Sequence, residues 1–205
     1  MNSTVDPIAS YFSLSYRESR DKFLTAAKQA GATLTAEKHP LQGSEGEDLY
    51  MDVACIGPDK ADNAIVIIAG THGIEGFCGA GVQTTLLGNA TALAMFHDIK
   101  LVLIHGHNPY GFSWLRRVNE DNIDLNRNYV DFSQDQDPND YYLEVQDLVL
   151  PEYFNDASEA AMQQWIANNG VENYQKAVMN GQRVDPQGIF YGGVGISWSN
   201  ETMHE

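Results

Sequence analysis

The sequence predicts an α/β fold, with three α/β/α layers around a mixed and mostly parallel central sheet. Two short runs, residues 64–69 and 99–104, are rich in β-branched residues and apolar on both faces, which is typical of strands covered on each side. Between them, residues 76–91 are rich in Gly, Ala and Leu and are long enough for the helical crossover that parallel strands require. Helix patterns on either side then alternate with strands, as in three-layer domains.

The N-terminal elements follow from local patterns. Ser15 and Glu18 have capping-box spacing, and apolar residues recur at helical spacing until Gly31, so a helix is expected between them. Residues 32–37 and 49–56 read as strands around a polar, Gly-containing turn, which predicts a hairpin at a sheet edge.

The C-terminal part is more helical and more acidic. Residues 156–169 and 171–179 predict two helices, and residues 189–195 form a Gly-rich loop. Between Tyr129 and Gln175 there is no Lys or Arg, while nine acidic residues crowd together within residues 131–159, and a solvated surface is the ordinary interpretation of such a run.

Composition limits the class of protein. With 205 residues and 43% apolar content, the chain is expected to form one domain, residues 1–205. The formal charge of −16 argues against nucleic acid or an anionic membrane as a partner, because both need a cationic face. No apolar run is long enough to span a bilayer, and the first residues lack a secretory pattern, so we expect the cytoplasm. Cys55 and Cys78 are expected to be buried, reduced thiols.

A candidate metal site follows the first β-branched run. His72 and Glu75 stand three residues apart among glycines, directly after residues 64–69. Ligand sites in open α/β sheets gather at the carboxyl ends of strands, and an imidazole and a carboxylate at this spacing can reach one ion. A surface histidine near an acid at a helix start would show the same spacing. The neighbouring residues must therefore decide whether the pair binds a metal.

The second apolar run, residues 99–104, is followed by a turn and then by two arginines. Asn108, Pro109 and Gly111 predict a turn, in which Gly111 can take positive φ. Arg117 and Arg127 follow on irregular structure, and in an acidic chain they are the natural readers of a carboxylate, although structural salt bridges are the competing explanation.

The other histidines are given ordinary roles. His105 and His107 lie at a strand exit. We expect their imidazoles to be packed in the protein or to support the metal ligands, rather than to bind metal directly. His39 and His97 are expected on the surface, and His204 is not expected to bind metal because it lies in a short polar tail.

In this order and at this spacing, the motifs together resemble the zinc carboxypeptidase (carboxypeptidase A-like) superfamily, and within it an uncharacterised bacterial branch of zinc peptidases. The resemblance covers residues 64–128 and, more loosely, 191–193 and 198–200. It implies that His72 and Glu75 are ligands of a Zn²⁺ cofactor, that Arg117 polarises the scissile carbonyl, and that Asn126 and Arg127 bind the terminal carboxylate of a small peptide or acyl-amino-acid substrate.

The sequence departs from that pattern in two places. Tyr110 stands where peptidase members usually carry an acid, so the local turn network is expected to differ. The third zinc ligand and the general-base Glu that the resemblance implies have no matching segment, so the C-terminal part of the fold is expected beyond Glu205 and the chain to be truncated, holding metal poorly as given.

Three alternatives remain. One is an N-acyl amino acid deacylase resembling succinylglutamate desuccinylase and aspartoacylase, although Asn128 and the Asn-Pro turn favour the peptidase side. Another is a non-catalytic module that binds carboxylates. A doubly wound nucleotide-binding domain has little support, because the glycines after residue 69 form neither G-x-G-x-x-G nor a P-loop. The oligomeric state is not predicted.

Overall fold

The computed structural model describes residues 7–203. The chain divides into two compact units, residues 1–120 and 121–205, which are described separately below. The expectation of a single domain stays a prediction. None of the helices in the described part of the chain combines the length and apolar character needed to cross a membrane.

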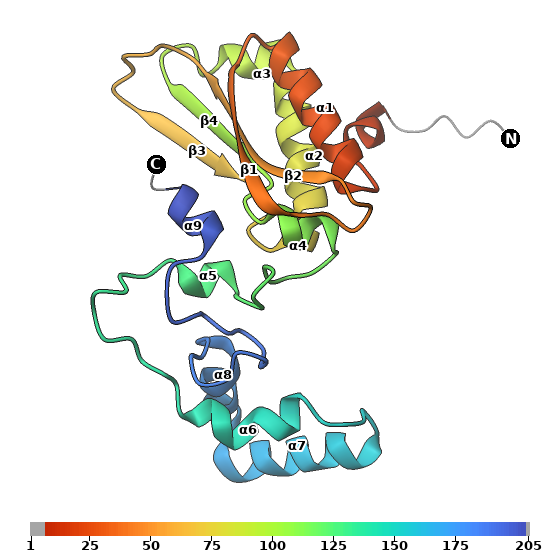
Figure 1. Cartoon of the computed structure of the whole chain (residues 1–205), viewed down its shortest axis with the longest axis vertical. Coiled ribbons are helices and arrows are strands. Elements are labelled where there is room, and N and C mark those ends of the chain that lie inside the picture. The colour runs from red at the N-terminus through yellow and green to blue at the C-terminus, as the bar shows by residue number, and fades with distance from the viewer. Residues whose placement is uncertain (1–6, 204–205) are drawn as a thin grey trace, which may run out of the picture. The chain divides into compact units, whose positions relative to one another are not determined.

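The four strands found within residues 7–203 all lie in the first unit, with helices before, between and after them (Figure 1). Its elements are η1 (Pro7–Tyr11), α1 (Tyr16–Gln29), β1 (Thr33–Gln42), β2 (Asp48–Ile56), β3 (Ala64–Ile68), η2 (Gly73–Glu75), α2 (Gly76–Leu87), α3 (Ala90–Ala94), β4 (Lys100–His105) and α4 (Pro109–Ser113). The predicted helix begins where expected, because the Ser15 side chain accepts the backbone N–H of Glu18.

The sheet has the order β1-β2-β4-β3. β3 and β4 pair in parallel, as the crossover predicted, whereas β1 with β2 and β2 with β4 are antiparallel. The predicted α/β class with a mixed sheet is therefore confirmed. The balance of directions differs from the mostly parallel sheet expected, because the β1–β2 hairpin joins the sheet through β2, next to β4.

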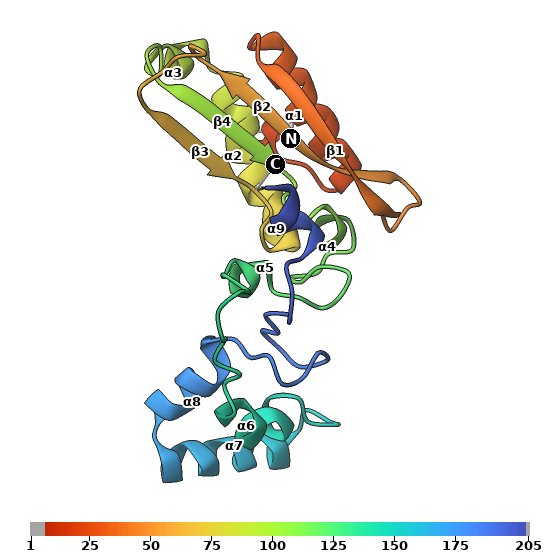
Figure 2. The same ribbon diagram turned by 60° about the vertical axis from the view of Figure 1, so that its left-hand side comes forward.

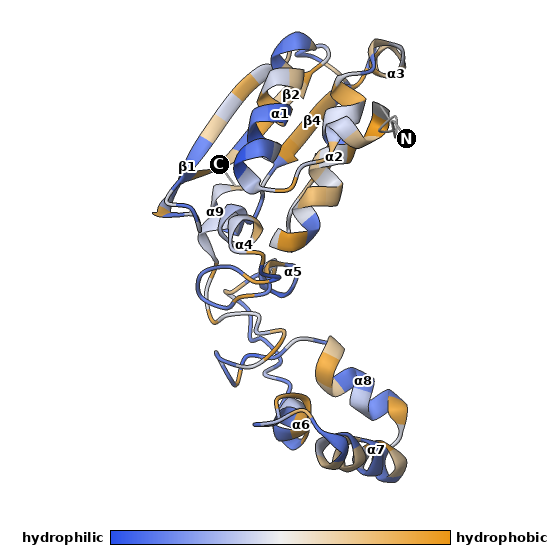
Figure 3. Cartoon of the chain, turned by 90° about the vertical axis from the view of Figure 1, so that its right-hand side faces the viewer, coloured by the Kyte–Doolittle hydropathy of each residue, from blue (hydrophilic) through white to orange (hydrophobic). Residues whose placement is uncertain are grey.

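Helices α1 and α2 cover the same face of the sheet (Figure 2). Phe23 and Ala27 of α1 and Leu87 of α2 pack with Leu101 and Leu103 of β4, all at 3% exposure or less. The apolar colouring of β4 and α2 shows the same core in Figure 3.

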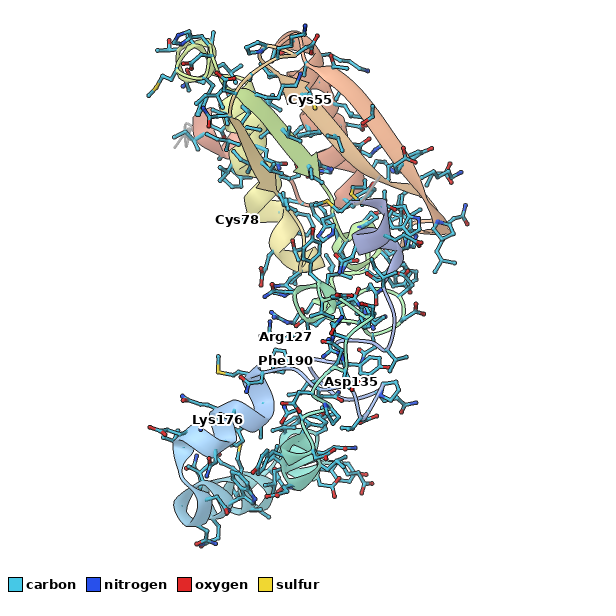
Figure 4. All side chains as sticks on the ribbon, turned by 90° about the vertical axis from the view of Figure 1, so that its left-hand side faces the viewer. Cys55, Cys78, Arg127, Asp135, Lys176 and Phe190 are labelled. Atoms are coloured by element: carbon cyan, nitrogen blue, oxygen red, sulfur yellow. The ribbon has the colours of Figure 1, made fainter. Side chains whose placement is uncertain are left out.

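Two expectations about burial are wrong. β3 is not covered on both sides but lies at the edge of the sheet, where Ile65, Val66 and Ile68 are 38%, 54% and 42% exposed. Cys78 is exposed near the start of α2 (Figure 4), and Cys55 is only partly buried. The sequence shows where apolar residues and cysteines lie, but their exposure depends on which elements pack beside them.

The carboxyl ends of β3 and β4 are tied together from α2. Gln83, 1% exposed, donates from Nε2 to the carbonyl oxygens of Ile67 (2.9 Å) and Ile104 (3.0 Å). Beyond the strands the pairing continues, since the N–H of His107 donates to the carbonyl of Ala69. The two strand exits are therefore held at a fixed spacing.

The second unit is helical within residues 121–203. Its elements are α5 (Leu125–Asn128), α6 (Tyr141–Val149), α7 (Asp156–Asn169), α8 (Val171–Met179) and α9 (Trp198–Thr202). The predicted helices over α7 and α8 are confirmed. The N-cap of α7 is Asn155, the residue just before the predicted range. Tyr142, Val145 and Ala177 form the core between α6 and α8.

The Gly-rich loop is organised by one buried amide. Asn128, fully buried, donates to the carbonyls of Gly192 (3.0 Å) and Gly195 (2.8 Å). Its Oδ1 accepts the N–H of Ser197 and the Nδ2 of Asn200, each at 2.9 Å. Because all four hydrogen-bonding positions of the amide are used, Asn128 fixes the loop rather than a ligand.

Candidate functional site

The turn that carries the candidate ligands begins where β3 ends. Gly70 has φ +78°, which a side chain would disfavour, and it redirects the chain after Ala69. His72 is extended and precedes the short helix η2, which ends at Glu75, and α2 starts at the next residue. The exit of a strand into a helix thus places both candidate ligands on one turn.

His72, Glu75 and Arg117 come together in the first unit. Nδ1 of His72 lies 3.1 Å from Oε2 of Glu75, and Nη1 of Arg117 lies 3.7 Å from Oε1 of the same carboxylate. The His72 side chain is 13% exposed, whereas those of Glu75 and Arg117 are 63% and 39% exposed. An imidazole, a carboxylate and a guanidinium therefore meet at a solvent-accessible turn.

The loop that carries Arg117 is bonded directly to this turn. The N–H groups of Gly73 and Ile74 donate to the carbonyls of Arg117 (3.3 Å) and Arg116 (3.1 Å). A Cβ on Gly73 would lie 1.9 Å from the carbonyl carbon of Gly111, so glycine is required for the approach of η2 to α4. The candidate ligands and Arg117 are thus held by backbone contacts rather than by long side chains.

The Asn-Pro turn forms the short helix α4. Asn108 caps it by accepting the N–H of Gly111 at 2.8 Å, with Pro109 in the first turn. Gly111 does not use the positive φ that glycine allows: it is helical, and a Cβ there would lie 2.6 Å from the Asn108 amide nitrogen. Tyr110, which departs from the family pattern, stacks on Trp114 at 5.7 Å between ring centroids.

Behind the turn lies a buried polar network. Nε2 of His105 lies 3.0 Å from Oγ of Ser19, and its ring stacks on Phe23. On its other side, Asp52 accepts two hydrogen bonds from the Arg20 guanidinium, at 2.7 and 2.9 Å. Burial, with a further contribution from the Arg20 charge, lowers the pKa of His105 to about 3, so the imidazole is neutral at pH 7. His105 is a packed imidazole, as expected.

His107 is also packed, at 4% exposure, with Nδ1 3.2 Å from Oγ1 of Thr71. His97 is exposed, as predicted. The expectation for His39 is wrong, because it is 1% exposed and its Nε2 lies 3.3 Å from Oε1 of Glu120. His204 lies outside the described residues.

Asn126 and Arg127, which are predicted to bind the substrate carboxylate, lie in the second unit. Asp124 caps α5 by accepting the N–H of Asn126, and the Asn126 side chain is exposed. The Arg127 guanidinium donates from Nε (3.2 Å) and Nη2 (2.8 Å) to the carbonyl of Met179, at the end of α8 (Figure 4). Gly181 makes room for this side chain, since a Cβ there would lie 2.6 Å from Cδ of Arg127. Arg127 therefore has a structural contact besides its predicted role.

The donor set fits a metal in part. A separation of 3.1 Å between His72 Nδ1 and Glu75 Oε2 is compatible with both atoms reaching one zinc ion at about 2.0–2.2 Å. Within residues 7–203, no three His, Cys, Asp or Glu side chains are grouped so that they could hold a metal ion. The described residues thus supply a pair of donors.

Comparison with solved structures finds partial likenesses. One is the crystal structure of thrombin activatable fibrinolysis inhibitor, at 19% identity and a TM-score of 0.41, covering 63% of this chain and 38% of that one. Others are the glutaminyl cyclases of Porphyromonas gingivalis (14% identity, TM-score 0.33, 50% and 42% covered) and Macrostomum lignano (10%, 0.31, 48% and 35%). The chain therefore spans less than half the length of these structures.

Among curated proteins, none matches this sequence. A family model described as "Protein of unknown function (DUF2817)" matches residues 12–205. This match covers both units and every candidate site residue named above. The chain belongs to the DUF2817 family.

Proposed function

We propose that this chain carries the zinc-binding and carbonyl-polarising part of a hydrolase that cleaves an amide or peptide bond next to a free carboxylate. The observation that carries the proposal is that the Glu75 carboxylate, on the turn after β3, lies 3.1 Å from Nδ1 of His72 and 3.7 Å from Nη1 of Arg117. In this proposal the third metal ligand and the general base come from elsewhere in the protein.

In the proposed site, His72 and Glu75 are the metal ligands. Zinc bound there would supply an activated water and a Lewis acid. The contact between His72 and Glu75 fixes the ring orientation before metal binds, and the short helix η2 holds the carboxylate in reach. The exposure of Glu75 leaves the site open to a substrate.

Arg117 is proposed to act on the substrate carbonyl. Its guanidinium reaches the far oxygen of Glu75 and is 39% exposed, so it can donate to a carbonyl oxygen beside the ligands as negative charge develops there. The backbone hydrogen bond between Gly73 and Arg117 holds Arg117 beside the turn that carries His72 and Glu75. Such preorganised donors are typically worth about 10²–10³ in kcat.

Asn126 and Arg127 are proposed to select the substrate by its carboxylate. A guanidinium and an amide together match a carboxylate with several hydrogen bonds. Small peptides or acyl amino acids are the substrate class this implies. Parallel assays with a blocked dipeptide, its C-terminal amide and an N-acyl amino acid separate a peptidase from a deacylase.

The proposal is tested by metal content and hydrolysis together. The protein is stripped with a chelator, reloaded with Zn²⁺, and analysed by mass spectrometry before its activity on the three substrates is measured. In the complete protein, which supplies the third ligand, we expect about one zinc per chain, and loss of both zinc and activity in His72→Ala and Glu75→Gln. Arg117→Lys should keep the zinc and lose about 10²–10³ in kcat.

His97→Ala is the matched control, because His97 is an exposed histidine away from the turn. It should leave metal and activity unchanged. A protein that takes up no stoichiometric zinc, or His72 and Glu75 variants that bind zinc like the wild type, would overturn the proposed metal site.

A further inference from the structure

The inference concerns His39, which lies on β1 and outside the predicted motifs. Among the ten residues of β1, all of them described, His39 is the one that is buried. The β1–β2 register shifts between Lys38 and Gln42, and this irregularity turns the imidazole inward where regular pairing would continue. A histidine with 1% exposure and a carboxylate partner is not an ordinary surface residue.

The hydrogen bonds fix the tautomer of His39. Its Nδ1 accepts the backbone N–H of Leu41 at 3.1 Å, so the proton of the neutral ring is on Nε2. Nε2 faces Oε1 of Glu120 at 3.3 Å, within the distance of an ion pair. Burial raises the pKa of Glu120, but the contact with His39, the backbone N–H of Glu120 and the Arg116 charge outweigh it, so the pKa lies below its usual value. Glu120 is therefore a carboxylate at neutral pH.

Glu120 lies three residues after Arg117, in the loop that follows α4. At its start the loop is fixed by the N–H of Arg116, which donates to the carbonyl of Gly111 at 2.8 Å. In its middle, the carbonyls of Arg116 and Arg117 accept the N–H groups of Ile74 and Gly73. The contact of Glu120 with His39 ties the loop to the sheet beyond Arg117. Arg117 thus lies between two anchors, and one of them is the contact of a buried imidazole with a carboxylate.

We propose that His39 is a positioning residue: through Glu120 it holds the Arg117 loop in register with the turn that bears His72 and Glu75. This inference rests on the proposed function for its effect on catalysis. The tether itself is a property of the first unit and is measurable without any metal or substrate.

Two substitutions separate the contacts of His39. His39→Gln places an amide N–H near the position of Nε2 and keeps the donor to Glu120. His39→Asn places an amide oxygen near the position of Nδ1, keeps the contact with Leu41 and does not reach Glu120. Both variants therefore lose the imidazole ring, but only His39→Gln keeps the contact with Glu120.

The first measurement is amide hydrogen exchange by NMR. In His39→Asn we expect the amides of Gly73 and Ile74 to exchange about 10-fold faster than in the wild type, the effect of losing one buried polar contact to a charged group. The amides of Phe23 and Leu103 in the core should change less, and His39→Gln should resemble the wild type. Unchanged exchange at Gly73 and Ile74, or equal acceleration of the core amides, would overturn the tether.

The second measurement is a mutant cycle with Glu120→Ala. Each single variant removes the same contact, so His39→Asn combined with Glu120→Ala should accelerate exchange no more than either alone. Additive effects would contradict the proposal, even where one variant is poorly stable.

The third measurement is kinetic. His39→Asn should lower kcat about 10- to 100-fold with KM nearly unchanged, because a carbonyl donor is displaced while substrate contacts remain, and His39→Gln should keep most of the activity. If exchange responds as expected but the wild type hydrolyses no amide, the tether stands and the proposed function fails. If the wild type is active and both His39 variants match it in rate and in exchange, the tether fails alone.

Discussion

Single residues in the first unit show how the environment decides the role of a histidine. His72 lies at an accessible turn beside a carboxylate, whereas His105 is fully buried and bonded to Ser19. Both lie at the carboxyl end of a predicted strand run, so position in the sequence alone does not separate them. What separates them is the packing of α1 over the end of β4, which depends on long-range contacts that no local pattern encodes.

The neutral state of His105 predicts a pH-dependent stability. Its pKa is lowered from 6.5 to about 3 in the folded protein, so between these values the unfolded chain binds one proton more. Folding is therefore favoured above pH 6.5, and this residue removes about 1.4 kcal/mol of stability for each unit that the pH falls from 6.5 towards 3.

We expect His105→Gln to show a shallower loss of stability than the wild type over this window, measured as the free energy of unfolding in urea at several pH values. The glutamine keeps an acceptor for Ser19 and does not titrate. His97→Gln, at an exposed position, should keep the wild-type slope. Parallel curves for the wild type and His105→Gln would show that His105 is not buried in its neutral form.

The candidate site could be predicted in part from the sequence. The adjacency of His72 and Glu75, and their place at a strand exit, follow from spacing and from the apolar run before them. The His39–Glu120 contact was missed, because an irregularity between two strands changes the direction of a side chain without leaving a mark in the residue pattern.

At the scale of elements, strands and long helices were easier to predict than short helices. α1, the four strands, α7 and α8 follow from capping and from apolar periodicity. α4, α5 and α9 are four or five residues long, and each is held by an Asn, Asp or Ser cap that also occurs in turns. α6 contains two tyrosines and two acids in an acidic stretch, so its buried face, Tyr142 and Val145, did not stand out.

The contact of η2 with α4 predicts an unusual sensitivity at Gly73. A methyl group there would meet backbone atoms of Gly111 and Phe112 at about 2 Å, so Gly73→Ala must push the His72 turn away from α4. We expect a cost of about 1–3 kcal/mol or more in unfolding free energy, together with weaker zinc binding.

Gly195→Ala is the matched control, since nothing lies within 4 Å of the added atom and its φ is not positive. Thermal melting and zinc titration of the two variants test the prediction. Equal melting temperatures and zinc affinities would contradict the close approach of the two helices.

The whole molecule carries a formal charge of −16, and its acids are unevenly placed. Like charges at this density repel in the folded state, and salt screens the repulsion. We expect the melting temperature to rise by a few degrees between about 10 mM and about 500 mM NaCl at pH 7, as a change of roughly 1–2 kcal/mol would produce.

The control is the same titration near pH 4.5, the isoelectric point of the sequence, where the net charge is close to zero. There the salt dependence should largely vanish. A melting temperature that falls with NaCl at pH 7 would mean that attractive pairs, such as Arg20 with Asp52, outweigh the repulsion.

The amide of Gln83 has a practical consequence for any mutational screen. This helix residue never meets solvent, yet one nitrogen spans both strand termini from which the His72 turn and the Asn108 turn depart. Loss-of-function selections should therefore recover Gln83 beside the exposed ligands, and even glutamate, of equal size but without the N–H donors, should fail there.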